Sequence, residues 1–443
     1  MTYGTFLLIL TLALFSITLI SFSIEKLSRY YVPIGIISAV IACVFYIPLL
    51  GSTDAAQTAI IGFIEFKALI FVFAMQIIVI IIQKEKIFQF LAIHVIHLAK
   101  GDPRKLFYMF CMITTFFAAI IADVTVSIIF APFIIQICKV LDVNPSPYLY
   151  GMTININLGS LITPFSSSEN ILISTNQNLD MSYYFTNLWI LFAIMIVVTM
   201  ILIDMTMIRG KQTVDKESRN TLLQILSKRI ALDRKKSRHF FTNILLTICV
   251  FAFIVVIPES FVGALIGAII FILFNKRSIN DVLKEIEWEL IFFFATLFIM
   301  IGILSDPKVG FLNMISDWFN GIAGGNAFIA VILVFTISSL LSAFISNAPI
   351  TLAFLPILTT LSAQPALQAF SVPLVTALLL GVNLGGNFLP QGAACDMMTL
   401  TIAKRNKLPD FTYKSLLKTG GKYATLHFLI CMGYLILLVF IYS

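Results

Sequence analysis

Three carboxylates of this sequence lie within long apolar runs. Asp123 stands in the middle of one run, and Glu169 and Asp396 follow points where two other runs are interrupted by asparagine, glycine and proline. An acid at bilayer depth costs about 2.5–3.5 kcal/mol on the insertion scale, so such residues mark ion or proton paths. These residue types therefore predict the binding and release of a cation or a proton.

Amide and hydroxyl side chains accompany the acids at the same interruptions. Neutral oxygens can replace the water shell of a dehydrated Na⁺, and Asn157 and Asn383 are the candidate Na⁺ ligands; we expect no other cofactor. The full predicted binding set is Asp123, Thr125, Asn157, Thr163, Ser166, Glu169, Asn170, Asn347, Thr351, Asn383, Asn387 and Asp396.

Each acid also has a purely structural interpretation. Asp123 could be the N-cap of a helix that begins there. Ser166 and Glu169 fit the S-x-x-E capping box. Asp396 could lie in the first turn of a helix, where the helix dipole favours a negative charge. The sequence leaves both interpretations open for each residue.

The interruptions recur in two copies. The stretch 116–134 aligns without a gap on 340–358, which places Asp123 on Asn347 and Pro132 on Pro356. Further along, Asn157-Leu158-Gly159 recurs as Asn383-Leu384-Gly385 at nearly the same separation. Matches in one order at one separation indicate an internal duplication.

The composition is that of a polytopic membrane protein. The chain has 443 residues, of which 59% are hydrophobic and 12% charged, and its mean hydropathy is +1.00. A soluble domain could not bury that much apolar surface. No Lys or Arg precedes the first apolar run, so we expect it to be a span and not a cleaved signal peptide. The six cysteines form no CxxC pattern, so neither a zinc site nor a disulfide framework is expected.

The apolar runs predict an all-α polytopic fold of two inverted repeats, each with five spans, a re-entrant hairpin and a broken helix. The repeats are residues 1–208 and 239–443, joined by a basic linker, 209–238. The predicted elements of the first repeat are Tyr3–Phe22, Tyr31–Leu50, Phe66–Gln83, an interfacial helix at Ile87–Ala99, a hairpin at Leu106–Lys139, a broken span at Tyr148–Asn178, and Tyr183–Ile208. Those of the second repeat are Phe240–Ile257, Phe261–Phe274, Trp288–Leu304, an interfacial helix at Phe311–Phe319, a hairpin at Ala327–Leu361, a broken span at Val372–Ala403, and Tyr423–Tyr442.

Charge predicts the orientation. The linker 209–238 carries ten basic and three acidic residues, so it is expected in the cytoplasm. An odd number of spans in each repeat then inverts the second copy and leaves both termini outside. The predicted location is the plasma (inner) membrane. The net charge of +7 is accounted for by cytoplasmic loops, and nucleic acid is not an expected partner.

The breaks resemble those of a known family. The segments NLGSLITPFSSSEN, GVNLGGNFLPQGAACD and IEWELIFFFATLFIMIG are similar to conserved stretches of the ion transporter superfamily, in its branch of arsenite permeases, NhaD-type antiporters and the pink-eyed-dilution protein. The resemblance implies inverted repeats, a scaffold that often forms homodimers, elevator-type alternating access, and substrate contact at Asp123, Asn157, Asn347, Asn383 and Asn387. This sequence departs from the family by carrying extra acid at Asp123, Glu169 and Asp396.

The predicted function is secondary active transport. The sequence has no HExxH or GxSxG motif and no phosphate-binding loop, so neither an enzyme nor an ATP-driven pump is expected. The favoured interpretation is a proton- or Na⁺-coupled exporter of a small inorganic ion or oxyanion, of the arsenite-permease or NhaD type. A Na⁺-coupled importer of dicarboxylate or sulfate from the same superfamily is the alternative. An intramembrane enzyme or a channel fits the interrupted repeats less well.

Overall fold

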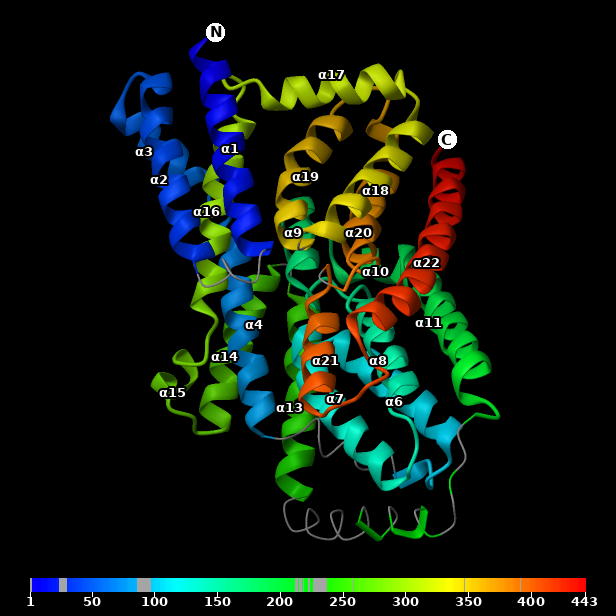
Figure 1. Ribbon diagram of the computed structural model, residues 1–443. Coiled ribbons are helices and arrows are strands. Elements are labelled where there is room, and N and C mark those ends of the chain that lie inside the picture. Colours follow the sequence, from blue (N-terminus) through cyan, green and yellow to red (C-terminus); the bar gives the residue numbers. More distant parts are fainter. Residues whose placement is uncertain are drawn as a thin grey trace.

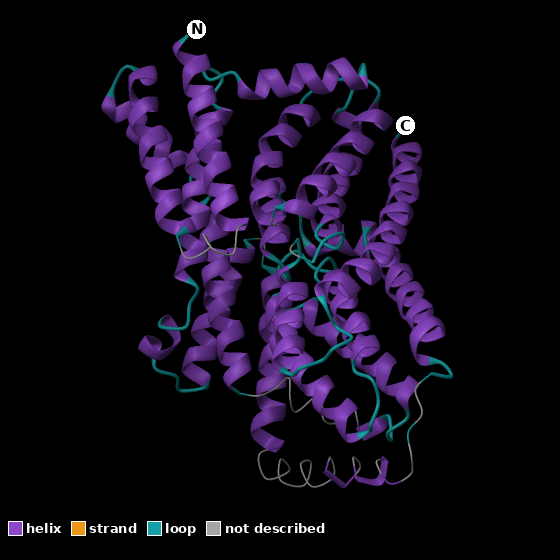
Figure 2. Ribbon diagram, in the orientation of Figure 1, coloured by secondary structure: helices purple, strands orange, loops and turns teal. Residues whose placement is uncertain are grey.

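We analysed a computed structural model of the chain. It describes residues 2–23, 30–85, 97–211, 237–257, 259–345, 347–390 and 392–443, together with 214, 217, 219–221, 224 and 225 of the linker. Within these ranges all regular structure is helical and no strand occurs (Figure 2). The predicted all-α class is therefore confirmed.

Nine helices of the described residues are long and apolar enough to cross a membrane. Two of them, Asp123–Val140 and Ala327–Phe344, are arms of the predicted hairpins, and a third, Gln368–Gly385, is one half of a broken span. The number of long apolar helices is therefore not the number of times that the chain crosses the membrane. The multi-pass character of the chain is nevertheless confirmed.

One group of helices packs beside the hairpins and breaks. It consists of α1 (Tyr3–Ser23), α2 (Tyr31–Leu50), α3 (Thr53–Phe63), α4 (Phe66–Lys84), α13 (Ser237–Val256), α14 (Ser260–Phe274), α15 (Ile279–Leu283) and α16 (Trp288–Ser305). Helices α1 and α2 pack on α16, where the Tyr31 and Phe293 rings meet at 5.0 Å, and α4 packs on α14. Helix α3 was not predicted; Ser52 caps it by accepting a hydrogen bond from the Ala55 amide.

Both predicted hairpins are present. The first consists of α6 (Pro103–Ala118) and α7 (Asp123–Val140), and the second of α18 (Ala327–Phe344) and α19 (Asn347–Ser362). Asp102 and Asn326 cap the outer arms, each accepting a hydrogen bond from a first-turn amide. The first hairpin lies in the lower half of the molecule and the second in the upper half (Figure 1).

Both predicted broken spans are present as well. The first consists of α8 (Ser146–Gly159) and α9 (Ser168–Gln177), and the second of α20 (Ser371–Gly385) and α21 (Ala394–Arg405). Helices α8 and α21 lie in the lower half and α9 and α20 in the upper half, so both breaks fall between the hairpins (Figure 1). Every residue of α8 is buried.

The remaining helices differ from the predicted bounds. The predicted span Tyr183–Ile208 is divided at Leu188 into α10 (Met181–Asn187) and α11 (Trp189–Ile203), and it ends in a π-helical turn, Asp204–Ile208. Helix α22 (Tyr413–Tyr442) begins ahead of the predicted Tyr423, because Thr412 and Ser415 form a capping box there. The interfacial helix α17 (Phe311–Ala323) lies across the upper end (Figure 1), whereas the predicted interfacial helix Ile87–Ala99 falls largely outside the described residues.

Helix α1 begins and α22 ends at the upper end of the molecule, and α13 begins at the opposite end (Figure 1). This arrangement is the one expected if the linker and the termini lie on opposite sides of a membrane. Which side is cytoplasmic stays a prediction.

Candidate functional site

The tip of each hairpin contacts the break of the opposite half. At the second tip, the Asn347 amide donates a hydrogen bond to the Glu169 carboxylate, which follows the first break, at 3.0 Å. At the first tip, the Asp123 carboxylate lies beside the Cys395 thiol, which follows the second break. The structure therefore brings each hairpin tip to the break of the opposite half.

The broken helices exchange contacts in the same reciprocal way. The Asn157 amide of α8 donates to Asp396 of α21 at 3.4 Å, and the Asn383 amide of α20 donates to Asn170 of α9 at 2.9 Å. These four residues are equivalent pairs in the sequence duplication. A two-fold axis produces such an exchange, because each copy then contributes the same two surfaces to the contact.

The site therefore has two parts. We call Asp123, Thr153, Asn157, Cys395 and Asp396 half-site 1. We call Glu169, Asn170, Asn347, Asn383 and Asn387 half-site 2.

In half-site 1, hydrogen-bond donors converge on a single carboxylate oxygen. Asp396 is 5% exposed, and its Oδ1 accepts from the Thr153 hydroxyl, from the Asn157 amide at 3.4 Å and from the Cys395 thiol at 3.7 Å. The closer acceptor of the thiol is Asn157 Oδ1, at 2.7 Å. Asp396 Oδ1 and Asn157 Oδ1 therefore each accept a hydrogen bond from another side chain of half-site 1.

In half-site 2, several polar atoms have no such partner. Asn383 is 4% exposed and Asn387 is 7% exposed. Asn383 Oδ1 and both side-chain polar atoms of Asn387 are buried without a hydrogen bond from the described protein. Buried polar atoms are normally paired, and these three, which lie at the second break, are therefore candidates for contact with a ligand.

The first break is held together by Asn170, Ser166 and Thr163. The Asn170 amide donates to the carbonyls of Ser160 at 2.8 Å and Thr163 at 2.9 Å. The Ser166 hydroxyl contacts the same two carbonyls. The Thr163 hydroxyl donates to the Ala119 carbonyl of the first hairpin at 2.6 Å. These predicted ligands thus satisfy backbone groups that the break sets free, which is the condition for irregular backbone at bilayer depth.

Two structural interpretations from the sequence are wrong. The N-cap of α9 is Ser167, whose hydroxyl accepts from the Asn170 amide at 3.3 Å, so Ser166 and Glu169 do not form a capping box. The N-cap of α7 is Ala122, which has no capping side chain. Asp123 follows it, and its carboxylate accepts from the Val124 amide at 2.7 Å.

Two further predicted residues, Asp396 and Thr125, lie in first helical turns, and Thr351 lies one turn into α19. Asp396 does so in α21, as expected for a dipole-stabilised acid. Thr351 of α19 is buried, and its hydroxyl donates to the Asn347 carbonyl at 3.0 Å within the same helix. Thr125 of α7 is half-buried. The Thr351 hydroxyl thus contacts only the backbone of a half-site 2 residue, and no hydrogen bond joins the Thr125 side chain to either half-site among the described residues.

Sequence reasoning missed Thr153, which lies one helical turn before Asn157 and on the same face of α8. Spacing along α8 could have identified it. It also missed Ser342, whose hydroxyl donates to Asn347 Oδ1 at 2.6 Å and to the Val382 carbonyl. That contact links the second hairpin to α20, and only the fold places the two segments together.

The charge of the site is negative. Asp123 lies close enough to both Glu169 and Asp396 for the carboxylates to repel one another. The segments 106–138, 140–208 and 309–403, which contain both hairpin tips and both breaks, have no Lys or Arg. No basic side chain of these segments therefore neutralises the acids. Four helices, α7, α9, α19 and α21, begin at the site, and their free N–H groups supply partial positive charge. No group of three His, Cys, Asp or Glu side chains arranged for a metal occurs among the described residues.

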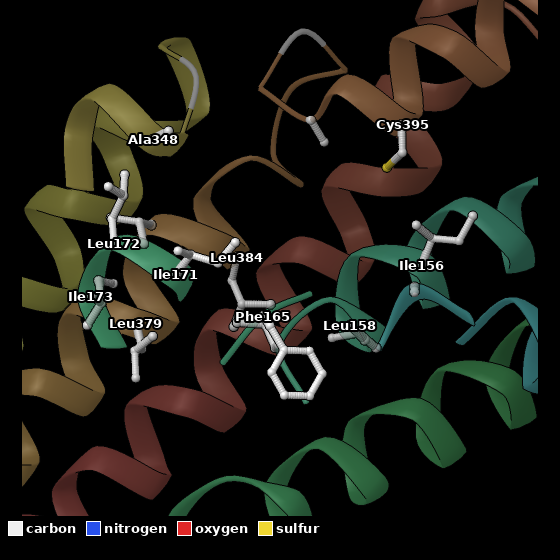
Figure 3. Close-up of a cluster of buried hydrophobic side chains, with 14 of the residues drawn as sticks. Ile156, Leu158, Phe165, Ile171, Leu172, Ile173, Ala348, Leu379, Leu384 and Cys395 are labelled. Carbon is white, nitrogen blue, oxygen red and sulfur yellow. The ribbon is translucent and has the colours of Figure 1, made fainter. Parts of the chain in front are cut away.

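Apolar side chains enclose the breaks. Ile156, Leu158, Ile171, Leu172, Leu379 and Leu384 of the broken helices belong to the buried core around them (Figure 3). Because these side chains exclude water, polar contacts at the site are stronger than they would be at a surface.

Comparison with known proteins places the chain among transporters. Residues 14–381 match the protein-family model described as "Citrate transporter". A 46 kDa membrane protein of Mycobacterium leprae is 28% identical over 403 residues, which are 88% of this chain and 92% of that protein. An uncharacterized transporter of Mycobacterium tuberculosis is 25% identical over 364 residues, or 82% of this chain and 83% of that one. The P protein of Mus musculus is 23% identical over 461 residues, which cover 86% of this chain and 54% of the P protein.

Proposed function

We propose that this chain, which belongs to the citrate transporter family, is a secondary active transporter that moves a small ion by alternating access. The observation that carries the proposal is the convergence of two hairpin tips and two helix breaks on buried acids and unpaired amides. Discontinuous helices that meet in this way form the binding sites of secondary transporters. The family membership agrees with the resemblance seen in the sequence.

In the proposed mechanism, residues 1–208 and residues 239–443 are two repeats with inverted orientation in the membrane. The reciprocal contacts of Asn157 with Asp396 and of Asn383 with Asn170 support it. The hairpins and broken helices form the moving domain, and the helices that pack beside them form the scaffold, which we propose to dimerise. Movement of this unit past the scaffold exposes the site to each side in turn.

The proposed cargo is a small inorganic ion, with a proton or Na⁺ as the coupling ion, as in arsenite-permease and NhaD-type exporters. Three acids and no Lys or Arg at the site favour a cation or a neutral hydroxide over a free polyanion. A bare anion would have to approach uncompensated negative charge, which raises its energy steeply in a medium of low dielectric.

Import of a carboxylate, such as citrate or a dicarboxylate, is the second candidate. The family description favours it. The N-termini of α7, α9, α19 and α21 also favour it, because helix N-termini bind anionic groups through their free N–H groups. A carboxylate could enter this acidic site together with a neutralising cation.

Reconstitution into proteoliposomes tests the proposal. Uptake of arsenite, Na⁺, phosphate, sulfate and citrate is measured under imposed Na⁺ and pH gradients. We expect saturable, gradient-dependent flux of one of these solutes, and Asp123→Asn should abolish its coupling to protons. Flux that never saturates would instead identify a channel. Wild-type pH coupling in Asp123→Asn would remove Asp123 from the mechanism.

A further inference from the structure

A cavity of about 330 Å³ lies beside the first break and is partly open to the outside. Its volume is within the range of pockets that hold small organic molecules. One wall is formed by the start of α4, the end of α13 and the start of α14, and the other by Pro164, Phe165, α9 and 178–181. Its lining, taken over the described residues, includes no member of half-site 1 or half-site 2. The cavity is therefore separate from the candidate transport site.

The buried side chains that line the cavity are almost all apolar. They include Phe71 of α4, Ile254 of α13, and Phe165 and Ile171 on the side of the break. The buried hydroxyl of Ser174 also lines it and is paired with the Tyr184 hydroxyl at 2.9 Å. Such walls favour an apolar body, because burying it removes apolar surface from water.

Three charged side chains line the cavity, and all three are exposed: Lys67, Glu259 and Asp180. The Lys67 ammonium donates to both carboxylate oxygens of Glu259 at 3.1 Å, so these two charges neutralise each other. The Asp180 carboxylate accepts from the Tyr183 amide at 2.9 Å, and no ion pair to it occurs in the part of the chain that the structure describes. The lining therefore carries one uncompensated negative charge, at its solvent-exposed edge.

This combination selects a class of ligand. An organic ammonium ion with a small apolar body places its charge at Asp180 and its body against the buried walls. An anion of the same shape would meet Asp180 without a free cation to compensate, because Lys67 is already paired. A metal ion such as Ca²⁺ or Mg²⁺ needs about six oxygen ligands, which a largely apolar lining with one free carboxylate does not supply.

The cavity joins two parts of the molecule that move relative to each other in the proposed function. Lys67 and Glu259 both belong to the helices that pack beside the hairpins and breaks, whereas Asp180 follows α9 of the first broken span. The two parts are in contact here: α4 packs on α9, and the rings of Phe165 and Phe251 of α13 lie 5.5 Å apart. A ligand that contacts both walls favours the arrangement in which they lie together.

We propose that this cavity binds a small amphipathic organic cation, with its ammonium group at Asp180 and its apolar body among Phe71, Phe165 and Ile171. The bound cation inhibits transport by holding the first break against α4 and α13. The binding step stands on the cavity alone, and the inhibition rests on the proposed transport function.

Thermal unfolding of the full chain in phosphatidylcholine nanodiscs tests the binding. The probes are 2-phenylethylammonium and its neutral isostere 2-phenylethanol. A ligand that binds only the folded protein raises its Tm as its concentration rises. We expect a saturable rise with both probes, and a Kd about threefold or more lower for the ammonium ion, since one exposed charge pair contributes only modestly. No saturable rise, or equal affinity for the two probes, would overturn the proposal.

Variants locate the bound probe. Asp180→Asn removes the charge and keeps a good N-cap for α10, so the two probes should then bind about equally. Asp317→Asn removes the same charge from an exposed position of α17 outside the cavity, and should keep the wild-type preference. Thr175→Phe fills the cavity from the wall of α9 and should abolish saturable binding of both probes. A charge preference retained in Asp180→Asn would refute the site, and this variant decides alone if Thr175→Phe fails to fold.

Inhibition is measured in proteoliposomes with the solute that the wild type transports. Because the half-sites stay free, 2-phenylethylammonium should lower the maximal rate with KM unchanged, and Asp180→Asn should require a higher concentration for the same effect. A rise in KM alone would place the probe in the transport site, and binding without inhibition would refute the coupling to movement. If the probes bind as expected but no solute is transported, the proposed function fails and the binding site stands.

Discussion

The two half-sites are copies of one arrangement, and they differ in what their side chains offer an ion. Both place an asparagine before a helix break and join it to a residue after the opposite break. In half-site 1 the neighbouring groups are a hydroxyl, a thiol and two carboxylates, whereas in half-site 2 they are amides and one carboxylate. The aligned segments share a backbone arrangement and differ in the chemistry of their side chains.

The shared backbone frame is visible where the broken helices meet the outer hairpin arms. A Cβ on Gly159 would lie 2.6 Å from the Thr115 carbonyl oxygen, and one on Gly385 would collide with the Ser339 carbonyl oxygen. These glycines and carbonyls are equivalent in the duplication. Close backbone contact is therefore a property of both halves, while the polar side chains differ between them.

The largest effect is expected from Asn170→Ala. The substitution removes donors from the Ser160 and Thr163 carbonyls and the acceptor of the Asn383 amide. Ser166 still contacts both carbonyls and Asn383 still donates to the Leu379 carbonyl, but three hydrogen bonds of about 0.5–1.5 kcal/mol each are lost. Thermal unfolding in nanodiscs should therefore show a loss of ~2–4 kcal/mol, together with loss of transport. Asn170→Asp keeps the oxygen and should be intermediate. Wild-type stability in Asn170→Ala would mean that this side chain does not hold the break.

The paired glycines test whether the frame is equivalent in both halves. Gly159→Ala and Gly385→Ala should each destabilise the protein by about 1–3 kcal/mol through overpacking, because the atoms they meet are backbone and cannot rotate away. Gly385→Ala should have the larger effect, since its contact is the closer one. Both are measured by thermal unfolding.

Gly433→Ala is the matched control in α22, because nothing lies within 4 Å of a Cβ there. It should be neutral or slightly stabilising, since alanine favours a helix over glycine. If Gly159→Ala were also neutral, the close approach in the first half would not be required.

Cys395 distinguishes a hydrogen-bond donor from a space-filling side chain. Cys395→Ala leaves the Asn157 oxygen unpaired and should cost ~1–2 kcal/mol. Cys395→Ser supplies a hydroxyl of similar size and should recover most of that stability. A serine variant as unstable as the alanine variant would show that the sulfur acts by packing alone.

The hairpins and breaks could be predicted from the sequence because polar residues, glycine and proline interrupt apolar runs there. A helix break that no glycine, proline or polar interruption marks could not be predicted in this way. The division at Leu188 has neither glycine nor proline beside it, and α22 continues through the adjacent pair Gly420-Gly421, although glycine is unfavourable inside a helix.

The site residues could be predicted as a group, but their partners could not. Three serines are consecutive before α9, so the sequence could not determine which of them caps the helix. The choice matters because Glu169 completes a capping box only with Ser166 as the cap, and in the structure it bonds to Asn347 instead. The Thr153–Asp396 contact joins segments far apart in the chain, and only packing determines which face of α8 meets α21.

The smallest effects are expected from two of the three predicted threonine ligands, Thr163 and Thr351. Thr163→Val removes a hydrogen bond that joins the first break to the first hairpin, and should cost about 1 kcal/mol. Thr351→Val removes only a bond to the preceding turn of its own helix, where the main chain is already paired, so a loss under ~0.5 kcal/mol is expected. Transport in proteoliposomes should be unchanged in Thr351→Val. A tenfold loss of transport there would add the Thr351 side chain to half-site 2 and extend that half-site along α19, which would make the difference between the halves larger than the present contacts indicate.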